Sequence, residues 1–221
     1  MTKRALACLA AIAATLALLG IFAFDRSIAL AVHASGLENS AFFVEGRSLL
    51  DVASGRALLG SHPSISALLL GGVLLVIGVL WWLARRSSLL ARALAFTGGV
   101  QLVTIGCGWL IKHAFGRMRP FNAIAHDGWN HLWFVGGDSF PSGHVAYFWG
   151  LFLPLCYLFP KYRIPLLIIP VYIAFARIDE NVHFLSDVLG SITLAALVTL
   201  IAAKLMGRLV RPAGQRHPFS R

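Results

Sequence analysis

The 221-residue sequence has few charged side chains. Asp, Glu, Lys and Arg make up 13% of it, whereas about 25% is usual in soluble globular proteins. Acidic residues are the scarcest, with nine Asp and Glu against 19 Lys and Arg. Hydrophobic residues make up 58%, and the mean hydropathy is +0.77. This composition excludes an ordinary soluble domain and predicts an integral membrane protein.

Cysteine is also scarce, and basic residues form no stripe on a polar domain. Cys8, Cys107 and Cys156 all fall in apolar runs without ligand-like spacing, which argues against a disulfide framework or a zinc site. The net charge is +10, but the chain has too little polar surface to present this charge as a nucleic-acid interface. We therefore expect a membrane-embedded chain with no nucleic-acid partner, and the sequence leaves the oligomeric state open.

Six apolar runs predict an all-α fold, a six-span transmembrane helical bundle. The runs cover residues 5–24, 65–84, 89–111, 145–159, 164–176 and 188–206. The first run could also be a cleaved signal peptide, but its twenty residues are long enough to cross a bilayer, which favours an uncleaved span. Residues 25–62 mix charged and apolar residues and predict one or two short amphipathic helices at the membrane interface.

The chain contains no internal repeat and no separate polar domain. We predict a single membrane domain over residues 1–221, with a motif-bearing core at 65–206. The stretch after Lys204 is basic and rich in Pro and Gly, so residues 207–221 are predicted to form an unstructured tail.

The distribution of basic residues predicts the orientation of the bundle. With the N-terminus in the cytoplasm, twelve of the 19 basic residues fall on the cytoplasmic side, as the positive-inside rule requires. They are Lys3, Arg4, Arg85, Arg86, Arg92, Lys161, Arg163, Lys204, Arg208, Arg211, Arg216 and Arg221. All nine acidic residues fall outside. Segments 112–144 and 177–187 then face outward together, and the short single-domain layout favours a bacterial inner membrane over a eukaryotic endomembrane.

The segment from Arg177 to Asp187 concentrates charge between two apolar runs. If one helix covers residues 182–206, His183 and Asp187 lie four residues apart on the same face. A carboxylate in that position can orient the imidazole and increase the basicity of its other nitrogen. The alternative is a capped helix start with both side chains solvated.

The two outward segments together carry four cations beside His144 and His183. These cations are Lys112, Arg117, Arg119 and Arg177. Several guanidinium and ammonium groups converging on one point suit an oxyanion, of which phosphate is the common biological case. Residues 141–144, Pro-Ser-Gly-His, open an apolar run and would present backbone N–H groups to such an anion.

The order and spacing of these residues resemble three signature motifs of the type 2 phosphatidic acid phosphatase (PAP2) superfamily. The first motif is Lys112, six residues, then Arg119-Pro120; the second is residues 141–144; the third is Arg177, five residues, His183, three residues, Asp187. The resemblance covers about residues 65–206. One departure is Ala176, where the family usually has Ser.

This resemblance implies a role for each matching residue. His183 would be the nucleophile that forms a phosphohistidine, Asp187 would orient it, and His144 would act as general acid and then as general base. The phosphate oxygens would be held by Lys112, Arg119, Ser142, Gly143 and Arg177. His113 and Arg117 occupy unspecified positions of the first motif, and we expect them at the rim of the site.

The resemblance implies a membrane lipid phosphatase that needs no metal and no cofactor. Undecaprenyl diphosphate, phosphatidylglycerol phosphate, phosphatidic acid and a lipid A-type glycolipid are candidate substrates. A metal site built from His126, Asp127, His131 and Asp138 is a weaker alternative. A phosphotransferase could use the same phosphohistidine. An anion transporter is disfavoured because residues 65–84, 145–159 and 188–203 carry no charge.

Overall fold

The computed structural model describes residues 1–36, 38–58, 63–85 and 88–206, so the predicted tail 207–221 lies outside the described residues. The described residues form helices and no strand, which confirms the predicted all-α class. The α-helices are α1 (Lys3–Leu19), α2 (Asp25–Ala34), α3 (Ala41–Ala53), α4 (Pro63–Ala84), α5 (Leu89–Phe115), α6 (Pro120–Ala125), α7 (Gly143–Leu158), α8 (Arg163–Asp179) and α9 (Leu185–Leu205).

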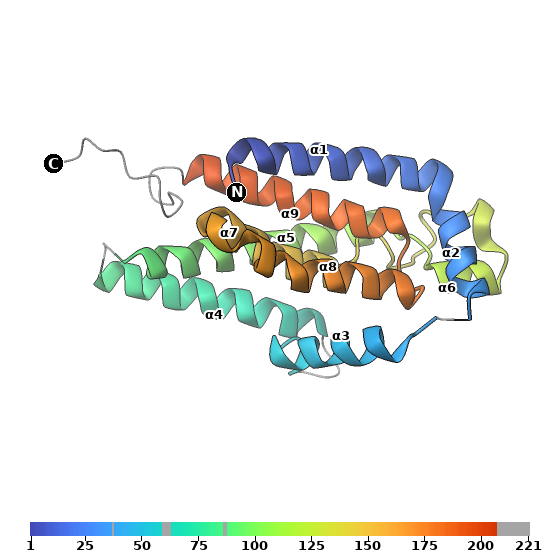
Figure 1. Ribbon diagram of the computed structural model, residues 1–221, viewed down its shortest axis with the longest axis horizontal. Helices are drawn as coiled ribbons and strands as arrows, with labels where there is room; N and C mark the ends of the chain where they lie inside the picture. Colours follow the sequence, from blue (N-terminus) through green and yellow to red (C-terminus); the bar gives the residue numbers. More distant parts are fainter. Residues whose placement is uncertain (37, 59–62, 86–87, 207–221) are drawn as a thin grey trace.

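The long helices run side by side along the longest axis of the molecule (Figure 1). Helix α1 packs on α9 and α4 packs on α5, whereas α7 contacts α5, α8 and α9 and therefore occupies the middle of the bundle. The last residues of α4, the first residues of α5 and the α7–α8 turn lie at the end that carries the N-terminus. At the opposite end lie α2, α6, the loop before α7, and the α8–α9 turn; we call this the polar end.

Four described helical stretches are long and apolar enough to cross a membrane. They are Lys3–Ala34, Ile65–Ala84, Leu89–Ala125 and Leu185–Leu205. Helix α7 is apolar but has 16 residues, and α8 has 17. The six-span arrangement therefore stays a prediction.

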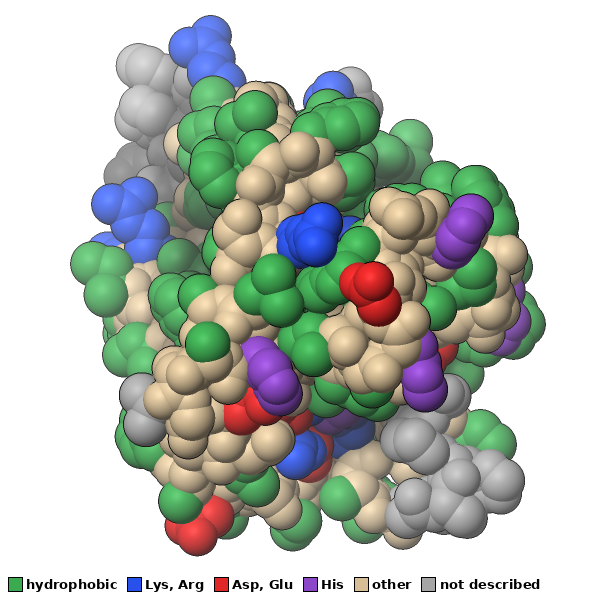
Figure 2. Space-filling view, turned by 90° about the vertical axis from the view of Figure 1, so that its right-hand side faces the viewer, with side chains coloured by type: hydrophobic (Ala, Val, Ile, Leu, Met, Phe, Trp, Pro, Cys, Tyr) green, Lys and Arg blue, Asp and Glu red, His purple; other side chains and the backbone are tan. Residues whose placement is uncertain are grey.

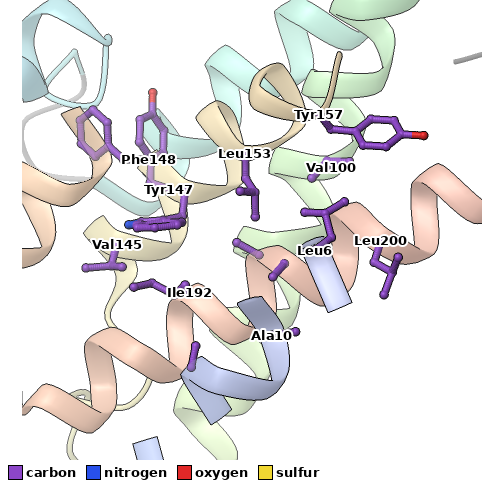
Figure 3. Close-up of a cluster of buried hydrophobic side chains, with 14 of the residues drawn as sticks. Leu6, Ala10, Val100, Val145, Tyr147, Phe148, Leu153, Tyr157, Ile192 and Leu200 are labelled. Carbon is purple, nitrogen blue, oxygen red and sulfur yellow. The ribbon is translucent and has the colours of Figure 1, made fainter. Parts of the chain in front are cut away.

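The interior of the bundle is closely packed (Figure 3). Leu6, Leu153 and Ile192 come from α1, α7 and α9 and meet in one buried cluster. Helices α4 and α5 can approach closely because Gly98 has no side chain. A Cβ at this position would lie 2.5 Å from the carbonyl oxygen of Gly71. This packing fixes the ends of α5, α7 and α9, from which the polar end is built.

Two short helices, α2 and α3, lie between α1 and α4 in the sequence, which agrees with the helices predicted in residues 25–62; residues 37 and 59–62 of that segment lie outside the described residues, and its place at the membrane interface stays a prediction. Helix α2 continues from α1 through one π-helical turn, Gly20–Phe24, and begins with Asp25. Helix α3 packs on α8. Both helices thereby bring charged side chains to the polar end.

Candidate active site

The three motifs meet at the polar end of the bundle, where Figure 2 displays Lys, Arg, Asp, Glu and His side chains close together. Lys112 lies in the last turn of α5 and Arg177 in the last turn of α8. Arg119 directly precedes α6, and Ser142 directly precedes α7. Residues that are far apart in sequence therefore converge because four helix ends lie together.

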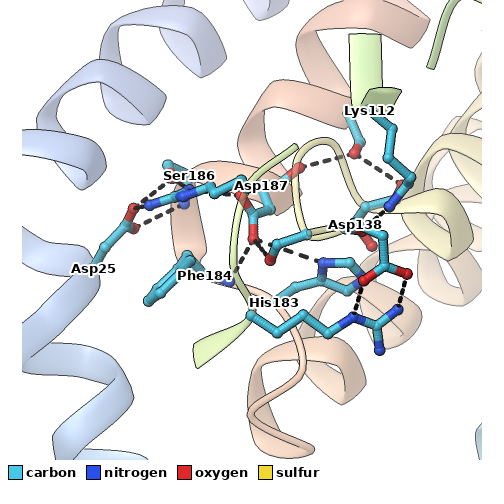
Figure 4. Close-up of polar contacts among 12 residues, drawn as sticks. Asp25, Lys112, Asp138, His183, Phe184, Ser186 and Asp187 are labelled. Atoms are coloured by element: carbon cyan, nitrogen blue, oxygen red, sulfur yellow. Dashed lines mark hydrogen bonds and ion pairs between the residues drawn. The ribbon is translucent and has the colours of Figure 1, made fainter. Parts of the chain in front are cut away.

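His183 lies in the turn before α9, which begins at Leu185. The condition of one helix over residues 182–206 is not met at its start, so helical spacing does not explain the pairing of His183 with Asp187. The two side chains still approach each other, with 3.6 Å between Nδ1 of His183 and Oδ2 of Asp187 (Figure 4). They meet because Asp187 turns back to accept a hydrogen bond from the backbone N–H of Phe184 at 2.8 Å.

Asp187 is fully buried and is held by several donors. Its Oδ1 accepts a hydrogen bond from Arg117 at 2.6 Å, and its Oδ2 accepts one from the Ser139 hydroxyl at 2.5 Å. The 3.6 Å contact with His183 is longer than a hydrogen bond. Such contacts often tighten when substrate binds. The buried carboxylate is thus fixed beside an imidazole whose Nδ1 has no hydrogen-bond partner among the described residues.

Arg117 is not at the rim of the site, and that prediction was wrong. Its side chain is 1% exposed and bridges Asp187 to Asp25, whose Oδ2 lies 2.7 Å from Nη2. The rings of Trp133 and Phe184 lie 4.4 and 4.1 Å from the guanidinium carbon. Two buried carboxylates require a buried cation, and Arg117 supplies it. This role could not be predicted, because Asp25 is 92 residues away in the sequence.

The cations assigned to phosphate binding have partners within the protein. Arg119 donates hydrogen bonds of 2.7 and 2.6 Å to the two carboxylate oxygens of Asp138. Lys112 donates to the backbone carbonyl of Asp138, and Arg177 donates to Glu180. The side chain of Asp138 is 59% exposed, so an incoming oxyanion can replace it on Arg119. Figure 4 shows Asp138 between Lys112 and His183.

The start of α7 adds uncharged donors to this cluster. The Ser142 hydroxyl is buried and has no hydrogen-bond partner among the described residues. Leaving a buried hydroxyl unpaired costs about 1–3 kcal/mol. Gly143 is the first residue of α7, where backbone N–H groups and the helix dipole favour an anion. An oxyanion bound at this helix start would satisfy the Ser142 hydroxyl.

His144 has polar partners from α3 and the residues after it, which the sequence analysis did not identify. Its Nε2 lies 3.1 Å from Oδ2 of Asp51, and its Nδ1 lies 3.5 Å from Nη2 of Arg56. Arg47 binds both Asp51, at 3.0 Å, and Glu180, at 2.5 Å. The available signal was the four-residue spacing of Arg47 and Asp51, which places both on one face of a predicted amphipathic helix.

The surroundings of His183 keep its imidazole neutral. The pKa of His183 is lowered to about 4, chiefly by burial and also by the positive charges of Arg177 and Lys112, while Asp187 opposes the shift. A neutral imidazole is the form that can act as a nucleophile. Burial raises the pKa of Asp138, but the hydrogen bonds from Arg119 and the positive charges of Arg119 and Lys112 together outweigh burial and lower the pKa, so Asp138 is an anion at neutral pH.

The described residues contain no group of three or more His, Cys, Asp or Glu side chains placed to hold a metal ion. In the loop considered for such a site, Asp138 binds Arg119. The polar end brings cations, two imidazoles and the buried Ser142 hydroxyl together, beside carboxylates that bind several of these groups. Such a donor set can bind an oxyanion, place a neutral imidazole beside it and supply a second imidazole for proton transfer.

Comparisons with known proteins agree with this chemistry. The chain is 29% identical to a lipid A 1-phosphatase of Rhizobium johnstonii over 102 residues, which are 45% of this chain and 42% of the relative. It is 30% identical over 136 residues to the Escherichia coli protein named "Putative undecaprenyl-diphosphatase YbjG", covering 61% of this chain and 65% of that protein. The chain thus spans less than half of the Rhizobium protein. No solved structure matches it significantly.

The family comparison covers the three motifs together. The model of the PAP2 superfamily matches residues 88–211, which is more than half of the chain and includes α5 to α9. Residues 1–87, with α1 to α4, lie outside the match. On this match, the chain belongs to the PAP2 superfamily.

Proposed function

We propose that the chain is an integral membrane lipid phosphatase that hydrolyses a phosphate monoester or diphosphate of a lipid through a phosphohistidine on His183. The observation that carries the proposal is the convergence of the His183–Asp187 pair, His144, and an oxyanion-binding cluster at one end of an apolar bundle. Membership of the PAP2 superfamily and the phosphatase names of the relatives support it.

In the first step His183 attacks phosphorus while the bond to the lipid oxygen breaks. His144 donates a proton to the departing oxygen, and Asp187 stabilises the positive charge that develops on His183. Asp51, 3.1 Å from His144, stabilises the protonated form of that imidazole. The step leaves a phosphohistidine and a dephosphorylated or monophosphorylated lipid.

In the second step water attacks the phosphohistidine. His144, now neutral, takes a proton from the water, and the phosphorus–nitrogen bond breaks to regenerate His183 and release inorganic phosphate. A second lipid hydroxyl or phosphate in place of water would give the phosphotransferase reaction, which a phosphorylated lipid product would reveal.

The phosphoryl oxygens are held by Lys112, Arg119 and Arg177, with the Ser142 hydroxyl and the Gly143 N–H as further donors. The phosphate replaces Asp138 on Arg119 and stays close to Arg177. Three cations can stabilise the charge of the transition state, a task that metal ions perform in many phosphoryl-transfer enzymes. We therefore propose that activity persists in the presence of EDTA.

The proposed arrangement in the membrane has six spans, with α7 and α8 as the two short ones, and the polar end at the outer face of a bacterial inner membrane. The phosphate of a lipid would reach this end from the outer leaflet. The names of the relatives favour a lipid A-type glycolipid or undecaprenyl diphosphate among the candidates, beside phosphatidylglycerol phosphate and phosphatidic acid.

The test is phosphate release by the purified full-length protein in detergent, with EDTA present, on the four candidate lipids. We expect release from at least one lipid, loss of activity in His183→Ala, and inhibition by orthovanadate. His113→Ala is the matched control, because His113 is exposed and stacks on Trp109 outside the cluster. An EDTA-sensitive activity, or full activity in His183→Ala, would contradict the proposal.

A further inference from the structure

Arg56, three residues after the end of α3, contributes a further cation beside His144. Its side chain is 11% exposed, and its Nη2 lies 3.5 Å from Nδ1 of His144. Arg56 belongs to none of the three motifs and lies outside the region that the family model matches. The candidate site therefore has a further cation besides Lys112, Arg119 and Arg177, and it lies at the Nδ1 atom of His144, whereas Asp51 lies at Nε2.

No carboxylate among the described residues accepts a hydrogen bond from Arg56. The nearest is Asp51, whose Oδ1 lies 3.8 Å from Nε, beyond hydrogen-bond distance. Asp51 already has closer partners in Arg47, at 3.0 Å, and His144, at 3.1 Å. A largely buried guanidinium without a hydrogen-bonded anion is costly, so Arg56 is poorly explained as a partner of Asp51 alone.

Arg56 faces a small cavity that also reaches the phosphate-binding residues. The cavity has a volume of about 90 Å³ and is lined by Arg56, Lys112 and Gly143 together with apolar side chains of α4, α5 and α7, among them Ala67, Ile105 and Ala146. One cavity thus combines two cations and a helix start with an apolar wall. This combination fits a phosphate that is attached to a hydrocarbon chain.

The position of Arg56 beside His144 identifies the part of the substrate that it would contact. His144 is the proposed proton donor to the leaving group, so Arg56 lies where the leaving group departs. A phosphate monoester leaves as an alkoxide whose charge is neutralised by the proton from His144. A diphosphate leaves as a lipid phosphate, which keeps negative charge after it receives the proton and requires a cation.

We propose that Arg56 binds the lipid-linked phosphate of a lipid diphosphate, so that diphosphates are the preferred substrate class of this site. This proposal rests on the proposed phosphatase function. His183 attacks the terminal phosphorus, the bond to the bridging oxygen breaks, and His144 protonates that oxygen. Arg56 holds the departing lipid monophosphate, and water then releases inorganic phosphate from His183.

The test compares a prenyl diphosphate with the prenyl monophosphate of the same chain length, using the purified full-length protein. We expect the wild-type protein to have the higher kcat/KM for the diphosphate. Arg56→Gln should lower kcat/KM for the diphosphate by about 10- to 100-fold, the value of one or two charge-assisted hydrogen bonds, and for the monophosphate by less than about threefold. Arg56→Lys keeps the positive charge, so its kcat/KM for the diphosphate should lie between those of the wild type and Arg56→Gln.

Arg26→Gln is the matched control, because Arg26 lies at the same end of the bundle but is exposed and stacks on Trp129, 5.2 Å from the ring centre. Equal losses on both lipids in Arg56→Gln, or a wild-type preference for the monophosphate, would overturn the assignment of Arg56 while leaving a phosphatase. If Arg56→Gln fails to fold, the same comparison of kcat/KM between the two lipids is made with the wild type and Arg56→Lys, and the same two outcomes overturn the assignment. No phosphate release from any lipid of the full panel would remove the proposed function itself.

Discussion

His183 and Asp187 form a pair in which the carboxylate has two tasks. Asp187 caps the start of α9 through the Phe184 N–H, and it carries the negative charge beside His183. The donors on Asp187 also include Arg117, so the carboxylate keeps its orientation without His183. A fixed carboxylate and a neutral imidazole are what a histidine nucleophile requires.

The burial of His183 predicts a dependence of stability on pH. Its pKa is about 4 in the folded protein and about 6.5 when unfolded, so below pH 6.5 the unfolded chain binds a proton that the folded chain does not. Stability should therefore fall as the pH falls from 6.5 to 4, by about 3 kcal/mol from this residue. Denaturant unfolding in detergent across this range measures the effect.

His183→Gln is the comparison for this measurement, because glutamine fills much of the space and does not titrate. As the pH is lowered from 6.5 to 4, the unfolding free energy of the wild type should fall relative to that of His183→Gln. Parallel curves for the two proteins would mean that His183 titrates normally and is not held neutral by its surroundings.

At the scale of elements, α2 and α3 complete a site whose motifs lie on α5 to α9. Asp25 begins α2 and binds Arg117, while Asp51 of α3 binds His144. The sequence predicted one or two short helices in this segment, and it provided the motif residues that meet at the polar end. It could not predict these two contacts, because each joins residues about 90 positions apart and no short-range pattern links them.

The bridge from Asp25 to Arg117 also ties α1 and α2 to the start of α9, where Asp25 accepts a hydrogen bond from the Ser186 N–H at 3.0 Å. Asp25→Asn should lower the free energy of unfolding by about 3 kcal/mol, because it leaves a buried guanidinium with one carboxylate fewer. It should also lower kcat, because Arg117 orients Asp187. Thermal unfolding and turnover of the purified variant measure both effects.

Asp127→Asn is the control for this change, since Asp127 is exposed and its backbone has a φ of 47° that asparagine tolerates. An Asp25→Asn protein with the melting temperature of the control would show that the α1–α2 junction does not depend on this ion pair.

For the whole molecule, the structure places both predicted outward segments at the same end of the bundle. The alternation of the six predicted spans puts segments 112–144 and 177–187 on one side, the basic residues predict that this side is the outer one, and the motif residues of both segments lie at this end. The irregular course of the loop before α7 was beyond prediction, because it depends on contacts such as the one between Ser139 and Asp187.

Thiol labelling in intact cells tests the proposed orientation. Cys8, Cys107 and Cys156 are first replaced by alanine, and one new cysteine is introduced at the polar end, His131→Cys, or at the opposite end, Lys161→Cys. Both positions are exposed.

The excess of basic residues at the end that carries Lys161 predicts that this end stays in the cytoplasm. A membrane-impermeant maleimide should then label His131→Cys in intact spheroplasts and Lys161→Cys only after permeabilisation. Each variant must retain phosphatase activity, so that labelling reports the active fold. The reverse pattern would place the active site in the cytoplasm, and the substrate would then have to be a lipid of the inner leaflet.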